Sequence, residues 1–221
     1  MVDIGAGTGR DAAWLASQGF SVIAIEPPAA MRADGARRHT DSKVRWIDDR
    51  LPSLAATLRL GIAADVVLLS AVWMHVAPTD RGRAFRKLVS LLRLGGVLAL
   101  TLRHGLVEPE RGMHPASQEE IERLARDHGL AVLHAKRAED SLGRPGVSWT
   151  QMALRLPDDG TDALPLLRHV ILHDDKSSTY KLGLLRALCR AADGSAGLAA
   201  DDDDQHVSLP LGLIALNWLR L

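Results

Sequence analysis

The stretch that decides the fold is Val2-Asp3-Ile4-Gly5-Ala6-Gly7-Thr8-Gly9-Arg10. A short apolar strand leads into three glycines at alternate positions, and the residues from Asp11 to Leu15 are typical of a helix start. Glycine is required at such a turn because the chain reverses with positive φ, and because a ligand must approach backbone that no Cβ screens. The stretch therefore predicts a nucleotide-binding turn.

The glycine spacing separates two classes of ligand. A dinucleotide fingerprint reads GxGxxG and holds a pyrophosphate at the helix N-terminus. Here Gly9 comes one place early, and Arg10 takes the position of the last glycine. This spacing, with the acid Asp3 ahead of the turn, suits a cationic sulfonium nucleoside, which has no phosphate. An ordinary strand-to-helix connection is the alternative for such a turn considered alone.

A second acid follows the next predicted strand. Residues 20–25 form an apolar run that is typical of a buried parallel strand, and this run ends at Glu26. A carboxylate at this strand tip can accept hydrogen bonds from both hydroxyls of a ribose that lies over the glycine turn. Glu26 is therefore predicted to bind a ribose, and a solvated acid at a strand end is the alternative.

The glycine stretch resembles the first motif of the class I S-adenosylmethionine-dependent methyltransferases. Later motifs of that family follow in order, with Glu26 after the second strand, an acid after the third, and Gly95-Gly96 before the fifth. The resemblance covers Val2 to about Leu156, and it implies methyl transfer from S-adenosylmethionine as cofactor. It implies that the cofactor is bound by residues at four strand ends: Asp3, Gly5, Ala6, Gly7, Gly9, Glu26, Asp48, Asp49 and Ser70.

The acid after the third strand is not unique. In the resembled family an acid at this place contacts the adenine amino group, and Asp48 and Asp49 both follow the predicted strand at residues 44–47. The sequence leaves the choice between them open, with a turn-forming Asp pair as the further alternative.

Two histidines are candidates for the catalytic base. His75 follows the fourth strand, residues 65–70, and His104 follows the fifth, residues 97–102. Both strands should end beside the point where the order of an open α/β sheet reverses, and ligands bind there. A histidine can accept a proton near neutral pH when the methyl acceptor must lose one. Capping of a backbone group is the alternative for each histidine. Trp73 is predicted to shape the pocket, and a position in the core is its alternative.

DNA bases are disfavoured as methyl acceptors. Methyltransferases of exocyclic base amines carry an Asn/Asp-Pro-Pro-aromatic motif after the fourth strand, and residues 70–75 lack it. The cytosine-C5 type needs a nucleophilic cysteine there, whereas the single cysteine of this chain is Cys189. We therefore expect a small-molecule acceptor.

The order of elements predicts an α/β fold with a helical tail. We expect a Rossmann-like, doubly wound, mostly parallel seven-stranded sheet with helices on both faces, and an antiparallel hairpin of residues 130–136 and 147–156 at one edge. Thr79 is predicted to cap a helix over 80–92 that Gly95-Gly96 close, and Ser117 to Glu120 form a capping box.

The domain organisation follows from these elements. Residues 1–156 are predicted to be a methyltransferase-like domain, 157–164 a polar linker and 165–221 a helical C-terminal segment. In this segment Ser177 or Ser178 caps a helix whose apolar face is formed by Leu182, Leu185, Leu188 and Cys189. Met1 stands where the central strand begins and the chain stops in mid-pattern, so we expect a truncated reading frame that lacks the helix preceding this strand.

The composition excludes several other classes of protein. The 27 Lys and Arg balance the 27 Asp and Glu, so no overall field attracts nucleic acid or an anionic membrane. One cysteine excludes an internal disulfide framework and a cysteine-based zinc site, which is consistent with a cytoplasmic protein. The apolar run at residues 209–221 is shorter than the roughly 20 residues that cross a membrane. We expect neither metal binding nor membrane insertion.

Two other functions are compatible with parts of the sequence. The chain is a cofactor-binding module without catalysis if its role lies in the helical tail, where residues 176–181 weakly resemble a helical module of bacterial endonuclease-like proteins. That reading includes a nucleic-acid or defence-related function. A nicotinamide-dependent oxidoreductase is the other candidate, and the glycine spacing opposes it.

Overall fold

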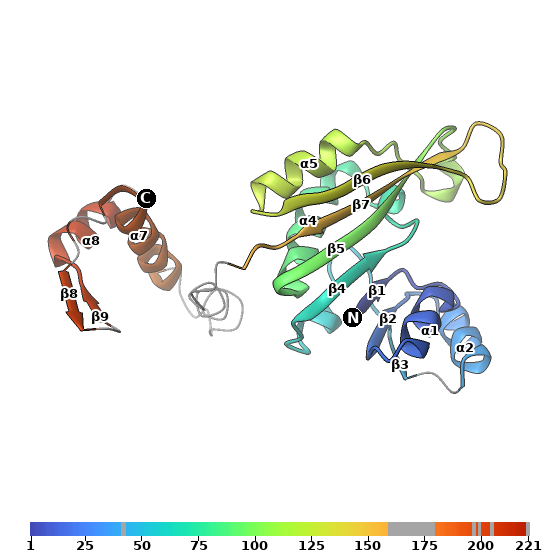
Figure 1. The fold of residues 1–221 in the computed structure, drawn as a ribbon, viewed down its shortest axis with the longest axis horizontal. Coiled ribbons are helices and arrows are strands. Elements are labelled where there is room, and N and C mark those ends of the chain that lie inside the picture. Colours follow the sequence, from blue (N-terminus) through green and yellow to red (C-terminus); the bar gives the residue numbers. More distant parts are fainter. Residues whose placement is uncertain (41–42, 159–179, 196–197, 199, 204–205, 220–221) are drawn as a thin grey trace. The chain divides into compact units, whose positions relative to one another are not determined.

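The computed structural model describes most of the chain in two compact units, Met1–Pro165 and Leu166–Leu221 (Figure 1). The described residues are 1–40, 43–158, 180–195, 198, 200–203 and 206–219. The candidate site lies within the first unit.

The N-terminal unit is built on one seven-stranded sheet with strand order β3-β2-β1-β4-β5-β7-β6. Neighbouring strands are parallel from β3 through β5, and β7 is antiparallel to both β5 and β6. This confirms the predicted α/β fold with an antiparallel hairpin at one edge. The strands are β1 (Val2–Ile4), β2 (Val22–Ile25), β3 (Val44–Ile47), β4 (Ala64–Leu69), β5 (Leu92–His104), β6 (Ala131–Glu139) and β7 (Ser148–Arg155).

Helices connect the strands and cover the sheet (Figure 1). The structure confirms Ser117 as a helix cap, since its Oγ accepts a hydrogen bond from the Glu120 backbone N–H at 3.2 Å, whereas the Glu120 carboxylate pairs with Arg81. The helices are α1 (Arg10–Ser17), α2 (Ala29–Arg38), α3 (Ala55–Leu58), α4 (Arg81–Leu91) and α5 (Gln118–Asp127), with single 3₁₀ turns at Trp73–His75, Pro78–Asp80 and Pro109–Arg111.

Alternate residues of β2 belong to separate hydrophobic clusters. Val22 and Ala24 pack with Ala12 and Leu15 of α1, whereas Ile25 belongs to the larger cluster that includes α4 and α5. Successive side chains of a strand point to opposite faces of the sheet, so both faces of the sheet are covered.

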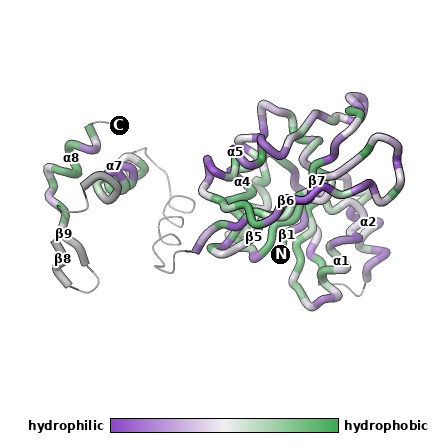
Figure 2. The backbone as a smooth tube through the Cα atoms, turned by 45° about the horizontal axis from the view of Figure 1, so that its top comes forward, coloured by the Kyte–Doolittle hydropathy of each residue, from purple (hydrophilic) through white to green (hydrophobic). Residues whose placement is uncertain are grey.

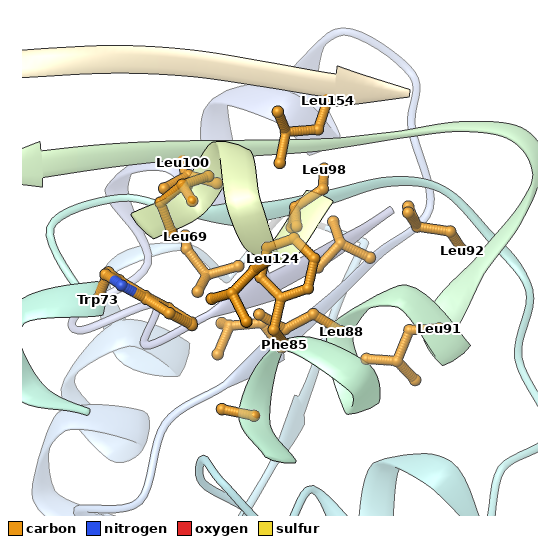
Figure 3. Packing of buried hydrophobic residues seen from close by; sticks show 14 of the residues in the cluster. Leu69, Trp73, Phe85, Leu88, Leu91, Leu92, Leu98, Leu100, Leu124 and Leu154 are labelled. Carbon is orange, nitrogen blue, oxygen red and sulfur yellow. The ribbon is translucent and has the colours of Figure 1, made fainter. Parts of the chain in front are cut away.

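The larger cluster is formed by the central strands and the helices that follow them. Figure 2 shows the hydrophobic residues along these strands. Figure 3 shows leucines of β4 and β5 together with Phe85 of α4 and Leu124 of α5. Trp73 is 1% exposed and meets Phe85 edge-on, with the ring centroids 6.2 Å apart, so Trp73 is a core residue. Such aromatic pairs add to the stability that burial provides.

The connection between α4 and β5 differs from the prediction. Helix α4 begins at Arg81 after a 3₁₀ turn that contains Thr79, and no side-chain cap is formed. Leu92 already pairs with Ala64, and the register of the two strands shifts before Val66 pairs with Val97. Gly95 and Gly96 therefore lie within the irregular start of β5 and do not close the helix. A Cβ on Gly96 would lie 2.7 Å from the Arg93 carbonyl oxygen, which explains the glycine.

The C-terminal unit contains α7 (Tyr180–Ser195), an antiparallel hairpin of β8 (Ala200–Asp203) and β9 (His206–Ser208), and α8 (Leu211–Leu219). The predicted apolar face of the first helix is largely exposed at Leu182, Leu188 and Cys189, whereas Ala187 and Ala191 are buried. Residues four apart share a helix face, and here the buried face consists of small side chains. The predicted caps, Ser177 and Ser178, lie outside the described residues.

No helix in the described parts of the chain combines the length and the hydropathy that a membrane crossing requires.

Candidate functional site

The glycine turn joins β1 to α1 with three left-handed glycines. The φ angles of Gly5, Gly7 and Gly9 are 69°, 57° and 82°. A Cβ on Gly5 would lie 2.5 Å from Val72 Cγ2, whereas a Cβ on Gly7 would meet no described atom within 4 Å. Gly5 thus allows close packing of the segment that follows β4, and Gly7 presents bare backbone to an approaching group.

Glu26 is in direct contact with the glycine turn. Its Oε2 accepts a hydrogen bond from the Gly7 backbone N–H at 2.7 Å, and the residue is only 8% exposed. The backbone N–H groups of Gly5 and Ala6 donate to the Ile25 carbonyl oxygen at 2.8 and 3.0 Å. Glu26 and the glycine turn, which were predicted separately, are therefore joined by hydrogen bonds between the tip of β2 and the turn after β1.

A cavity of about 320 Å³ opens at the carboxyl ends of the parallel strands. Its walls come from the ends of β1, β2 and β3 and from the segment after β4, so it lies where the strand order reverses. Open α/β sheets bind ligands at this place. The lining residues are Ile4, Gly5, Ile25, Glu26, Pro27, Asp49, Arg50, Leu51, Ala71, Val72, His75 and Val76.

Asp3 lies beneath the turn and is 2% exposed. Its Oδ2 has no hydrogen-bond partner among the described residues. Burial, together with the charges of Asp11 and Glu26, raises the pKa of the carboxyl from 3.8 to about 7, against a hydrogen bond from the Ala12 backbone and the charge of Arg10. Desolvation and like charges both disfavour an ionised carboxyl, so this group would gain from a nearby cation.

The structure separates the two acids after β3. Asp48 is exposed, and one of its carboxylate oxygens lies 2.9 Å from Arg32 Nη2. Asp49 lines the cavity, and its Oδ2 accepts hydrogen bonds from the backbone N–H and the hydroxyl of Thr57, both at 2.8 Å. Of the pair, Asp49 is the one that lines the cavity.

The two candidate bases also lie in different surroundings. His75 lines the cavity. His104 Nε2 lies 2.7 Å from Thr150 Oγ1, and burial together with the charge of Arg137 lowers its pKa, while Glu119 opposes this. Ser70 directly follows β4, ahead of the cavity-lining Ala71. The structure thus brings His75 together with Glu26 and Asp49.

Sequence reasoning missed most of the apolar wall. Ile25, Pro27, Leu51, Val72 and Val76 line the cavity, and each lies at or shortly after the end of a predicted strand. Their position at the carboxyl end of a strand could have identified these residues from the sequence, whereas their residue type could not.

Comparison with protein families assigns the first part of the chain. Residues 2–100 match the family model of a methyltransferase domain. The N-terminal unit carries a methyltransferase domain. Residues 160–221 match the model of a domain of unknown function. A search of curated protein sequences found no match.

Solved structures with the same fold include methyltransferases and a cyclase. The 1,6-didemethyltoxoflavin-N1-methyltransferase of Burkholderia thailandensis, with bound 1,6-didemethyltoxoflavin and S-adenosylhomocysteine, is 22% identical with a TM-score of 0.57, over 71% of this chain and 70% of that chain. Magnesium protoporphyrin IX methyltransferase of Synechocystis PCC 6803, with bound S-adenosylmethionine, is 18% identical with a TM-score of 0.55, over 70% and 68%. The [4+2]-cyclase SpnF is 15% identical with a TM-score of 0.56, over 71% and 73%. These identities establish the fold alone.

Proposed function

We propose that the N-terminal unit binds S-adenosylmethionine in the cavity at the strand ends and transfers its methyl group to a small molecule. The observation that carries the proposal is the 2.7 Å contact between Glu26 Oε2 and the Gly7 N–H, because it places a carboxylate over the glycine turn at the mouth of the cavity. The methyltransferase domain supports the reaction type.

The residues around the cavity fit a cationic nucleoside. Glu26 and Asp49 line it, Asp3 adds a buried carboxyl beneath the turn, and the lining cation, Arg50, is exposed. Opposite charge within a few ångströms favours the ionised form of a carboxyl, and a cavity of about 320 Å³ is in the range of small-ligand sites. An anionic pyrophosphate would meet repulsion from the same groups.

Each residue has a distinct part in holding this cofactor. The Glu26 carboxylate accepts hydrogen bonds from the ribose hydroxyls, and Asp49 accepts one from the adenine amino group. In the turn from Gly5 to Gly9, Gly5 lines the cavity and Gly7 provides backbone that a ligand can approach closely, whereas Gly9 packs against Trp46. Asp3 contributes a buried carboxyl whose ionised form a bound sulfonium would favour.

The cofactor supplies an electrophilic methyl group on a sulfonium. The chain's contribution is to hold an acceptor atom in line with that group and to exclude water, because close and aligned reactants need little further catalysis. His75 lines the cavity and accepts a proton when the acceptor must lose one. We assign this role to His75 rather than His104, since His104 is engaged with Thr150.

The acceptor class is a small molecule. Two proteins of the same fold are named as methyltransferases of small molecules, one of 1,6-didemethyltoxoflavin and the other of magnesium protoporphyrin IX. Residues 70–75 lack the motif of base-amine methyltransferases. The single cysteine supports a cytoplasmic location.

Titration calorimetry with S-adenosylhomocysteine tests the proposal. We expect Glu26→Ala to weaken binding about 10- to 150-fold, since hydrogen bonds to a charged group contribute about 1.5 to 3 kcal/mol. Asp65→Ala is the matched control, because it removes an exposed carboxylate near the amino end of β4, and it should leave the affinity unchanged. Equal affinities for wild type and Glu26→Ala would exclude the assigned role.

Cofactor binding without methyl transfer is the second candidate. The similarity to a [4+2]-cyclase shows that this fold also occurs in a protein named for a different reaction, and a separate unit follows the methyltransferase domain in this chain. Tight binding of S-adenosylmethionine with no transfer of labelled methyl to a panel of small-molecule acceptors would favour this candidate. Transfer to one acceptor would exclude it.

A further inference from the structure

Ala71 has a left-handed backbone at the edge of the cavity. Its φ is 59°, in a region that residues other than glycine rarely adopt. Ala71 lines the cavity two positions after the end of β4. A residue in such a conformation keeps it only where the surrounding structure holds it there. The contacts of Ala71 therefore show what shapes this wall.

The contact that holds Ala71 comes from the neighbouring strand. Thr101 Oγ1 accepts a hydrogen bond from the Ala71 backbone N–H at 2.8 Å. Thr101 lies in β5, one residue beyond Leu100, which pairs with Leu69 at the end of the β4–β5 ladder. The hydroxyl thus supplies an acceptor where the backbone ladder between the two strands ends.

The conformation of Ala71 determines where Val72 lies. Val72 Cγ2 is 2.5 Å from the position that a Cβ on Gly5 would take, so the Val72 side chain packs directly on the backbone of the glycine turn. A change of φ at Ala71 would rotate the chain that follows and move Val72 away from Gly5. The width of the cavity between the glycine turn and this wall therefore depends on Ala71.

The other end of the same segment is also held. Arg81 Nε donates to the Val76 carbonyl oxygen at 3.1 Å, and Arg81 Nη2 donates to the Pro115 carbonyl oxygen at 2.7 Å. Arg81 is 4% exposed and forms an ion pair with Glu120. The segment from Ala71 to Val76 is thus attached at its start to β5 and at its end to Arg81, and His75 lies between these attachments.

We infer that Thr101 is a positioning residue for the cofactor site, although it does not line the cavity. Its hydroxyl holds Ala71 in the left-handed conformation and so sets the wall of Val72 and His75 against the glycine turn. This inference rests on the proposed function, because it assigns the wall to a cofactor.

The first test needs no ligand. Thr101→Val keeps the shape of the side chain and removes the hydroxyl, whereas Thr101→Ser keeps a hydroxyl. In the ¹⁵N-labelled protein we expect the Ala71 amide to exchange with solvent about 2- to 13-fold faster in Thr101→Val, the range that one neutral hydrogen bond provides. Thr101→Ser should retain most of the protection. Equal protection in wild type and Thr101→Val would overturn the inference.

The second test measures the affinity for S-adenosylhomocysteine by calorimetry. A wall that holds its binding conformation for less of the time lowers the apparent affinity in proportion, so Thr101→Val should bind about 2- to 13-fold more weakly and Thr101→Ser close to wild type. Thr150→Val is the matched control, because Thr150 is a buried threonine on β7 whose hydroxyl contacts His104. It should leave the affinity unchanged.

A double substitution tests the physical cause. Glycine adopts positive φ readily, so in an Ala71→Gly background the wall no longer depends on the Thr101 hydroxyl to the same degree. Thr101→Val should then weaken binding less than it does beside Ala71, and an equal loss in both backgrounds would refute the assigned cause. If the wild type binds no S-adenosylhomocysteine, the proposed function fails. If it binds and Thr101→Val binds equally well, only this inference fails.

Discussion

Asp3→Asn is expected to flatten the pH dependence of stability and to stabilise the N-terminal unit above neutral pH. The Asp3 carboxyl is 2% exposed, and its Oδ2 lacks a hydrogen-bond partner among the described residues. Burial and the charges of Asp11 and Glu26 raise its pKa from 3.8 to about 7. The folded protein therefore binds a proton on Asp3 over a pH range where the unfolded chain has lost it.

The sign and size of the effect follow from this difference. Because the folded state binds more protons between about pH 4 and pH 7, the free energy of unfolding falls as the pH rises through this range. One pKa unit corresponds to about 1.4 kcal/mol, so the change from 3.8 to about 7 corresponds to roughly 4 kcal/mol. Asparagine does not titrate and removes this dependence. Its amide needs partners of its own, which offsets about 1 to 3 kcal/mol of the gain.

Urea unfolding followed by tryptophan fluorescence measures this effect. Four of the five tryptophans, Trp14, Trp46, Trp73 and Trp149, lie in the N-terminal unit, and Trp218 lies in the C-terminal unit, so the signal reports mainly the N-terminal unit. Wild-type stability should fall between pH 5 and pH 8 by about 2 to 3 kcal/mol, and the Asp3→Asn variant should show a smaller slope. Asp65→Asn, which removes an exposed carboxylate, should keep the wild-type slope. A wild-type slope retained in full by Asp3→Asn would refute the argument.

Two further substitutions test the packing around the site, and both are measured by urea unfolding. Glu120→Ala leaves the guanidinium of the buried Arg81 without its charge partner, so we expect a loss of about 1 to 3 kcal/mol, whereas Glu119→Ala in the same helix turn removes an exposed carboxylate and should cost less. Gly96→Ala places a methyl group 2.7 Å from one carbonyl oxygen and 2.9 Å from another, and should cost about 1 to 3 kcal/mol. Gly82→Ala in α4 meets no described atom within 4 Å and should stabilise the unit by up to about 1 kcal/mol. Equal losses of stability in Glu120→Ala and Glu119→Ala would contradict the contact between Arg81 and Glu120. Equal losses in Gly96→Ala and Gly82→Ala would contradict the close packing at Gly96.

The larger elements of the fold could be predicted because their signals are local. The glycine turn requires residues that adopt positive φ, and Gly5, Gly7 and Gly9 all do so. The buried strands appear as apolar runs, and the Ser117 cap follows from its place ahead of the acidic first turn of α5. The junction of α4 and β5 escaped prediction, because the pairing of Leu92 with Ala64 depends on a strand distant in sequence, and this pairing ends the helix before its glycines.

By itself the sequence determined the fold class, the glycine turn and the carboxylate at the tip of β2, since each depends on residue type and short-range spacing. Only the tertiary structure separated Asp49 from Asp48, because that choice depends on the salt bridge from Arg32 and on the contacts with Thr57. The same holds for the hydrogen bond from Ala71 to Thr101, whose partners are 30 residues apart in the chain. Local patterns specify which elements form, whereas the directions of side chains at the strand ends are set by the neighbours that packing brings beside them.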